Sequence, residues 1–227
     1  DSLLHFVKPV FDRRVFLKTC TNGSSELMTN LSMSLVNALY NLQLMKIAGE
    51  NGVAAYGAVM YVNFIFVATF LGYAIGCAPV ISYHYGAGNH AELKNLYKKS
   101  MSIILVWGVI LFGAAQLLAP VLSKIFVGYN TGLYAMTLHG FRVYAIAFLI
   151  IGINIFGSSF FTALNNGLIS AVISFLRTLM FQVIMVLTLP LWFGINGIWS
   201  AISVAEALTL IMTTTFFVRQ KDKYHYL

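Results

Sequence analysis

Long stretches without charged residues constrain the fold of this chain more than any other feature of its sequence. Residues 27–45, 53–81, 101–123 and 143–176 contain no Asp, Glu, Lys or Arg. A bilayer core of about 30 Å needs roughly 20 apolar residues in helix to cross it. Lipid offers no hydrogen-bond partners, so a spanning backbone must satisfy its own polar groups, as a helix does. The chain is therefore predicted to be an all-α integral membrane protein.

Composition excludes a soluble globular domain. The chain is 59% hydrophobic and 9% charged, whereas soluble domains are typically about 25% charged. A chain of 227 residues also has too little interior to hide that many apolar side chains from water.

Turn signals divide the apolar stretches into six predicted transmembrane helices. The clearest signals lie at residues 48–52, at Asn165-Asn166-Gly167 and at residues 193–197, each rich in Gly or Asn. The predicted spans are residues 24–46, 53–81, 100–127, 141–163, 168–190 and 197–218. Residues 1–23 are predicted to be a cytoplasmic basic linker, and residues 220–227 a cytoplasmic tail.

Basic residues near the predicted helix ends indicate the orientation. Ten lie on one side of an alternating six-span topology, and three, Lys46, Lys124 and Arg142, lie on the other. The positive-inside rule then places both ends of the chain in the cytoplasm, in a multi-pass protein of the plasma membrane. The same rule accounts for the net charge of +7, so no nucleic-acid partner is expected. The charged first residues argue against a signal peptide, and the lack of an initial Met suggests a piece of a longer protein.

A polar stripe marks the first predicted span as functional. Glu26, Asn30, Ser34, Asn37 and Asn41 follow one another at intervals of three or four residues. At about 100° per residue, all five fall within roughly 80° of the helix surface. The Asn residues could be interhelical packing contacts, and Glu26 could lie at the membrane interface. A carboxylate beside amide oxygens also suits a Na⁺ or proton site, so Glu26, Asn30 and Asn37 are the candidate ion-coupling residues.

Further polar residues inside the spans are candidates for a substrate cavity, because ionisable and polar groups in a membrane tend to be functional. Glu206 lies in the middle of the sixth span, and Arg177 in the fifth is either its partner or close enough to extend to the cytoplasm. Gly72-xxx-Gly76 in the second span predicts a close helix contact. The cavity candidates are Asn41, Tyr61, Asn63, Asn154 and Glu206.

Enzyme chemistry and a structural metal find no support in the sequence. No nucleophile–base arrangement or phosphate-binding loop is present, and His84 and His90 are poorly spaced for a metal pair. Cys20 and Cys77 have no motif spacing. We expect no enzyme activity, no catalytic residue, no metal and no cofactor, apart from a coupling ion, H⁺ or Na⁺.

Two sequence runs resemble the multidrug and toxic compound extrusion (MATE) family of antiporters. They are NGSSELMTNLSMSLVNALYNLQLMKIAGENGVAAYGAVMYV at residues 22–62 and PVISYHYGAGNHAELKNLYKKS at residues 79–100. The resemblance is to the start of the C-terminal half of that family. It implies that the six helices form one lobe of a twelve-helix transporter, with the missing N-terminal six-helix lobe as partner.

The resemblance further implies proton- or sodium-driven export of cationic or amphipathic drugs and toxic compounds across the lipid bilayer. Some members place a cation site in this lobe between a Glu of the seventh helix and an Asp of the tenth. Glu26 matches the former, whereas residues 141–163 contain neither Asp nor Glu. A lipid-linked oligosaccharide flippase of the same superfamily and a non-transporting six-helix scaffold subunit are the alternatives.

Overall fold

The computed structural model describes residues 11–226, except the side chains of Asn22, Ser25, Glu26, Met28 and Thr29. Every regular element in this part of the chain is helical. The elements are α1 (Arg13–Gly86), α2 (His90–Val127), α3 (Thr131–Tyr144), the 3₁₀ segment η1 (Ala145–Ala147), α4 (Phe148–Ala163), α5 (Gly167–Phe175), the π-helical segment η2 (Leu176–Met180), α6 (Phe181–Phe193) and α7 (Ile195–Tyr224).

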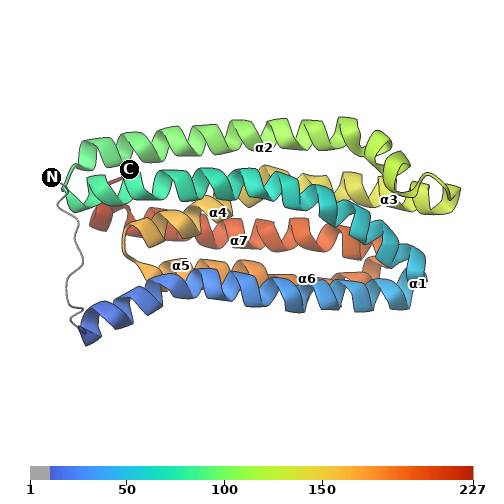
Figure 1. Ribbon diagram of the computed structural model, residues 1–227, viewed down its shortest axis with the longest axis horizontal. Helices are drawn as coiled ribbons and strands as arrows, with labels where there is room; N and C mark the ends of the chain where they lie inside the picture. The colour runs from blue at the N-terminus through green and yellow to red at the C-terminus, as the bar shows by residue number, and fades with distance from the viewer. Residues whose placement is uncertain (1–10, 227) are drawn as a thin grey trace.

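The α1 element is a helical hairpin. It consists of two helices joined at Gly49, whose φ of 63° and ψ of −153° are not helical. Figure 1 shows the chain reversing there, so that residues 13–48 and 50–86 run antiparallel. We call these the first and second halves of α1. A side chain rarely adopts this backbone conformation, so glycine is what allows the reversal.

The hairpin brings the number of spans in the described residues to the six that the sequence predicts. By length and hydropathy, α1, α2, α5–α6 and α7 are each able to cross a membrane, and α3 and α4, bent by 47°, are together long and apolar enough for one more span. Since α1 contributes two antiparallel helices, the bundle has six spans (Figure 1). The first half of α1 starts, and α7 ends, at the same end of the bundle.

Three helices begin well before the predicted spans, and α7 continues to Tyr224, into the predicted tail. The helical part of α1 begins at Arg13, inside the predicted linker, α2 begins at His90 rather than near 100, and α3 begins at Thr131 rather than near 141. Hydropathy identifies only the apolar part of a helix, whereas the helix itself continues into polar sequence until a residue caps it.

Short polar side chains provide those caps. Asp12 accepts the backbone N–H of Arg14 at 2.7 Å at the start of α1. Asn89, Asn130 and Asn166 each accept an N–H three residues later, at the starts of α2, α3 and α5. These side chains satisfy amide groups that have no partner inside the helix, which fixes where each helix begins.

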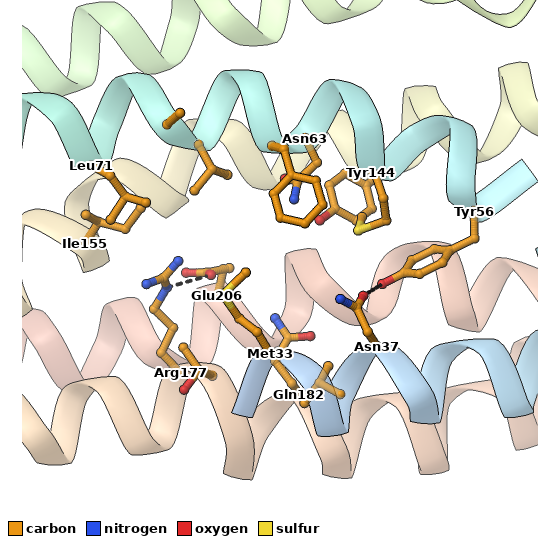
Figure 2. A pocket seen from close by; sticks show the side chains of 16 residues that line it. Met33, Asn37, Tyr56, Asn63, Leu71, Tyr144, Ile155, Arg177, Gln182 and Glu206 are labelled. Atoms are coloured by element: carbon orange, nitrogen blue, oxygen red, sulfur yellow. Dashed lines mark hydrogen bonds and ion pairs between the residues drawn. The ribbon is translucent and has the colours of Figure 1, made fainter. Parts of the chain in front are cut away.

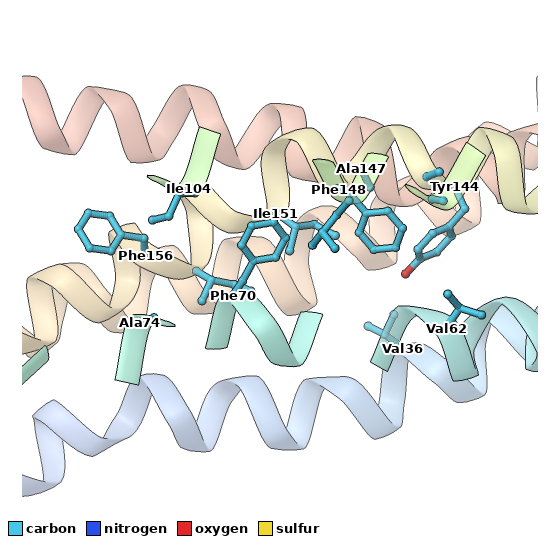
Figure 3. Close-up of a cluster of buried hydrophobic side chains, with 14 of the residues drawn as sticks. Val36, Val62, Phe70, Ala74, Ile104, Tyr144, Ala147, Phe148, Ile151 and Phe156 are labelled. Atoms are coloured by element: carbon cyan, nitrogen blue, oxygen red, sulfur yellow. The ribbon is translucent and has the colours of Figure 1, made fainter. Parts of the chain in front are cut away.

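Apolar side chains from α1, α2 and α4 form the core that holds the spans together. Figure 3 shows Phe70 and Ala74 of α1 meeting Ile104 of α2 and Ile151 and Phe156 of α4. Each of these five side chains is at most 3% exposed.

Within the described residues, no helix packs closely at Gly72-xxx-Gly76. A Cβ on either glycine would meet nothing within 4 Å, and both residues are exposed. Close approach occurs instead at Gly140, where a Cβ would lie 2.5 Å from the Trp199 ring, and at Gly152, where it would collide with Phe70. The spacing of two glycines shows that they share a helix face but leaves open whether another helix packs there.

Candidate functional site

A cavity of about 270 Å³ opens among the helices near the middle of the bundle. Its walls come from both halves of α1, α3, α4, η2, α6 and α7, so segments far apart in sequence meet there (Figure 2). The lining is mostly apolar, with Met33, Met60, Phe64 and Leu71 among the larger side chains. Polar groups are few and concentrated, as in sites for small organic ligands.

An ion pair stands at one side of this cavity. Arg177 of η2 donates from Nε to Oε1 of Glu206 on α7 at 2.9 Å. Asn154 of α4 donates from Nδ2 to the other oxygen, Oε2, at 2.7 Å. The Glu206 side chain is 1% exposed and that of Arg177 14%. Burial of a carboxylate without a partner is costly, so these contacts offset the cost of placing Glu206 there.

The segment that carries Arg177 is unusual. Residues 176–180 form a π-helical turn, with the α-helices α5 and α6 on either side. Such a turn contains one more residue than an α-helical turn and rotates the side chains that follow it. It often occurs at functional sites.

Two tyrosines hold amide side chains at the other side of the cavity. Tyr56 donates to Oδ1 of Asn37 at 2.9 Å, and Tyr40 donates to Oε1 of Gln182 at 3.1 Å. The two tyrosine rings stack on each other with centroids 5.0 Å apart. Figure 2 shows Asn37 and Gln182 pointing into the same space as Glu206. Fixing the amide oxygens on tyrosine hydroxyls leaves the amide N–H groups for other partners.

Several residues expected from sequence meet at this cavity. Asn37, Asn63 and Glu206 line it, and Asn154 contacts Glu206. The Asn63 Oδ1 atom is buried and has no hydrogen-bond partner in the described part of the chain.

Two of the cavity candidates lie elsewhere. Asn41 does not line the cavity, and neither does Tyr61, whose side chain is 66% exposed and stacks on Phe126 with centroids 5.9 Å apart. Tyr61 is two residues from Asn63, or about 200° around the helix, so the two face opposite directions. Asn41 lies on the same face of its helix as Asn37. However, a shared face does not tell which residues along the length of the helix border the cavity.

Of the three ion-coupling candidates, the structure describes the side chains of Asn30 and Asn37 but not that of Glu26. Glu26 belongs to the first half of α1, but its side chain lies outside the described part of the chain. Asn30 is exposed on the same half, does not line the cavity and has an interaction of its own.

Sequence reasoning did not find every residue of the site. Of the two alternatives for Arg177, the structure shows pairing with Glu206 rather than extension to the cytoplasm. Tyr144 lines the cavity and is 3% exposed, yet a single Tyr in an apolar helix gives no sequence signal. The π-turn also has none, so the direction of Arg177 could not have been calculated from α-helical spacing.

Comparison with known proteins identifies the family to which this architecture corresponds. The MatE family profile matches residues 27–188, well over half of the chain. Among the curated proteins, none matches the chain significantly.

Solved structures match the fold over nearly the whole chain. The "Crystal structure of MATE in complex with MaL6" has a TM-score of 0.87 and 19% identity, over 96% of this chain and 49% of that one. An outward-facing multidrug resistance MATE family transporter has a TM-score of 0.86 and 20% identity, over 95% and 48%.

A third match is a transporter of the MOP superfamily from Pyrococcus furiosus, described as having a binding pocket of reverse polarity that suggests a different function. Its TM-score is 0.84 at 19% identity, over 93% of this chain and 48% of that one. The chain thus spans about half the length of these structures. At such identities the likeness concerns the fold alone.

Proposed function

The chain belongs to the MatE family, and on that premise we propose that it forms one lobe of a transporter that exports amphipathic small molecules in exchange for protons or sodium ions. The observation that carries this proposal is the cavity itself. It combines an apolar wall with a buried ion pair and three amide side chains, Asn37, Asn63 and Gln182, while a fourth amide, Asn154, contacts Glu206.

Polar groups at this depth need a reason to be there. Charged and amide side chains inside a membrane bundle are unfavourable unless they pair or serve a solute pathway, and transporters place their substrate sites near the bilayer midplane. A scaffold subunit needs no such cavity, and its polar residues would be scattered. The convergence of seven helical segments on one cavity therefore favours transport over a scaffold role.

The proposed coupling residue is Glu26, with Asn30 and Asn37 supplying amide oxygens along the same helix face. A carboxylate that binds a proton or Na⁺ on one side and releases it on the other couples export to the ion gradient. The second six-helix lobe completes the alternating-access transporter in this proposal. The plasma membrane is the proposed location.

The coupling role is tested by Glu26→Gln in the protein expressed from its complete coding sequence. Glutamine keeps the shape but neither titrates nor carries charge, so gradient-driven export of an amphipathic dye from inverted vesicles should fall to the level of vesicles that lack the protein. Dye binding to the purified variant should persist, since the proposed role of Glu26 is to bind the coupling ion and not the dye.

The matched control is Glu50→Gln, which changes an exposed carboxylate beside the Gly49 reversal and should leave export unchanged. Export by Glu26→Gln at the wild-type rate would exclude Glu26 as the coupling residue.

One observation favours a second candidate, the lipid-linked oligosaccharide flippase. Such a protein needs basic residues to hold a pyrophosphate, and Arg177 does line the cavity. However, Glu206 neutralises it at 2.9 Å, and Arg177 is the one basic residue among the lining residues described. The charge balance therefore favours the exporter. Transport of a prenyl pyrophosphate by the purified protein would reverse this order.

A further inference from the structure

The carboxylate in the cavity, Glu206, is already paired with a cation. Both oxygens of Glu206 accept strong hydrogen bonds, one from Arg177 and one from Asn154. The side chain is 1% exposed. A cationic substrate that bound Glu206 would meet a carboxylate whose charge Arg177 already balances, and it would lie close to the like charge of that guanidinium. Glu206 is therefore poorly placed to recognise a cation.

The guanidinium is only partly engaged. Arg177 uses Nε for Glu206, and no described residue accepts from its two terminal nitrogens. These carry four N–H groups in a planar arrangement that fits the two oxygens of a carboxylate. Figure 2 shows the guanidinium beside the Glu206 carboxylate, and Arg177 is one of the residues that line the cavity. The cavity thus presents a cationic donor edge without a partner.

Two amides add donors of the same kind. The oxygens of Asn37 and Gln182 accept from Tyr56 and Tyr40, so their amide nitrogens have no partner in the described residues. Among the described amides that line the cavity, only one side-chain acceptor is unpaired, and it is Oδ1 of Asn63. The unpaired polar groups are therefore mainly hydrogen-bond donors, and they select for a ligand with acceptors.

We propose that this cavity binds the carboxylate of amphipathic acids or zwitterions, with Arg177 as the anchoring residue and Gln182 and Asn37 as neighbouring donors. The apolar body of the ligand lies against Met33, Met60 and Phe64. The export of such a ligand rests on the proposed function, but its binding does not.

The charges of Arg177 and Glu206 favour a ligand with a single negative charge. The described lining residues hold one cation, Arg177, and Glu206 lies 2.9 Å from it. A phosphate or pyrophosphate would bring two or more negative charges next to Glu206 in a medium of low dielectric constant, where their repulsion is strong. A ligand that also carries an amine would balance the added charge and offer N–H groups to Asn63.

The experiment compares a rhodamine that has a free carboxylate with the methyl ester of the same dye. Binding of each to the purified protein in lipid nanodiscs is followed by fluorescence anisotropy, without an ion gradient. Wild type should bind the free carboxylate more tightly. Arg177→Lys keeps a cation for Glu206 but loses the planar donor edge. Its affinity for the carboxylate dye should drop about tenfold, the size of one charged hydrogen bond, with less than a twofold change for the ester.

Arg142→Lys is the matched control, because Arg142 is exposed and does not line the cavity, and it should bind both dyes as wild type does. Equal losses for both dyes in Arg177→Lys, or a wild-type preference for the ester, would overturn the proposal. So would displacement of the carboxylate dye by a prenyl phosphate at lower concentration than by a fatty acid.

Vesicle export separates the two proposals. If the carboxylate dye binds through Arg177 but is never exported, the inference stands and the proposed function fails. If both dyes are exported equally by wild type and Arg177→Lys, the exporter stands and the carboxylate site fails.

Discussion

At the scale of single residues, glycine determines how closely these helices approach. Trp199 of α7 is 1% exposed and its ring lies over Gly140 of α3. Gly157 of α4 lies against Thr213 of α7 in the same way. Small residues at such crossings allow van der Waals contact between helices, which is the main attraction between them in a lipid environment.

Gly140→Ala should therefore destabilise the protein by about 1–3 kcal/mol, because the added methyl group would lie within 2.5–2.8 Å of the Trp199 ring and a buried ring has little room to move. The apparent melting temperature in detergent measures this effect. Gly76→Ala, where a Cβ meets nothing within 4 Å, is the control and should melt at or above the wild-type temperature. If the two variants have the same melting temperature, close packing at Gly140 does not contribute to the stability of the protein.

At the scale of elements, two turns at the same end of the bundle share a design. Gly49-Glu50-Asn51-Gly52 reverses α1, and Gly194-Ile195-Asn196-Gly197 joins α6 to α7. The first glycine of each has positive φ and strongly negative ψ, 63° and −153° at Gly49, 55° and −133° at Gly194. A four-residue pattern thus makes two hairpins with almost no loop.

Gly49→Ala tests whether this conformation matters. Any side chain is strained at this φ and ψ, so the substitution should cost about 1–3 kcal/mol, although a Cβ there would touch nothing within 4 Å. Thermal unfolding in detergent should show a lower midpoint than wild type. Gly57→Ala changes a helical position where a Cβ would also meet nothing within 4 Å, and it should be neutral or stabilising. If it lowers the unfolding midpoint as much as Gly49→Ala does, the destabilisation does not come from the turn.

The elements also show how far sequence reasoning reaches. The six spans and the turns at Gly49 and Gly194 follow from hydropathy and Gly/Asn signals, which are local properties. The cavity is harder to predict, since it depends on which stretch of each helix meets its neighbours. Angular spacing put Asn37 and Asn41 together, yet only the first of the two lines the cavity. The π-turn also changes the angle around the helix axis at which the Arg177 side chain lies, and the α-helical spacing of 100° per residue does not predict that change.

At the scale of the whole molecule, the fold gathers basic residues at one end. The start of α1, the start of α2 and the end of α7 lie at that end (Figure 1). They carry Arg13, Arg14 and Lys18, then Lys94, Lys98 and Lys99, then Arg219, Lys221 and Lys223. By the positive-inside rule, this end is expected to face the cytoplasm.

Labelling of single cysteines tests this orientation. In a background with Cys20→Ala and Cys77→Ala, Tyr129→Cys lies at the opposite end, at a position 82% exposed in the wild type. It should react with a membrane-impermeant maleimide on intact cells. Lys94→Cys, exposed at the basic end, should react only after the membrane is permeabilised. The reverse pattern would invert the topology.

The ion pair between Arg177 and Glu206 has a consequence for biosynthesis. A charged side chain at the centre of a lone span costs about 2.5–3.5 kcal/mol on insertion, and Arg177 emerges from the ribosome well before Glu206. The short turn at Gly194 joins their two spans, so both charges are able to leave the translocon as one neutral hairpin. The last two spans then behave as a single unit of insertion, and a chain that stops before α7 would leave Arg177 without its counter-ion.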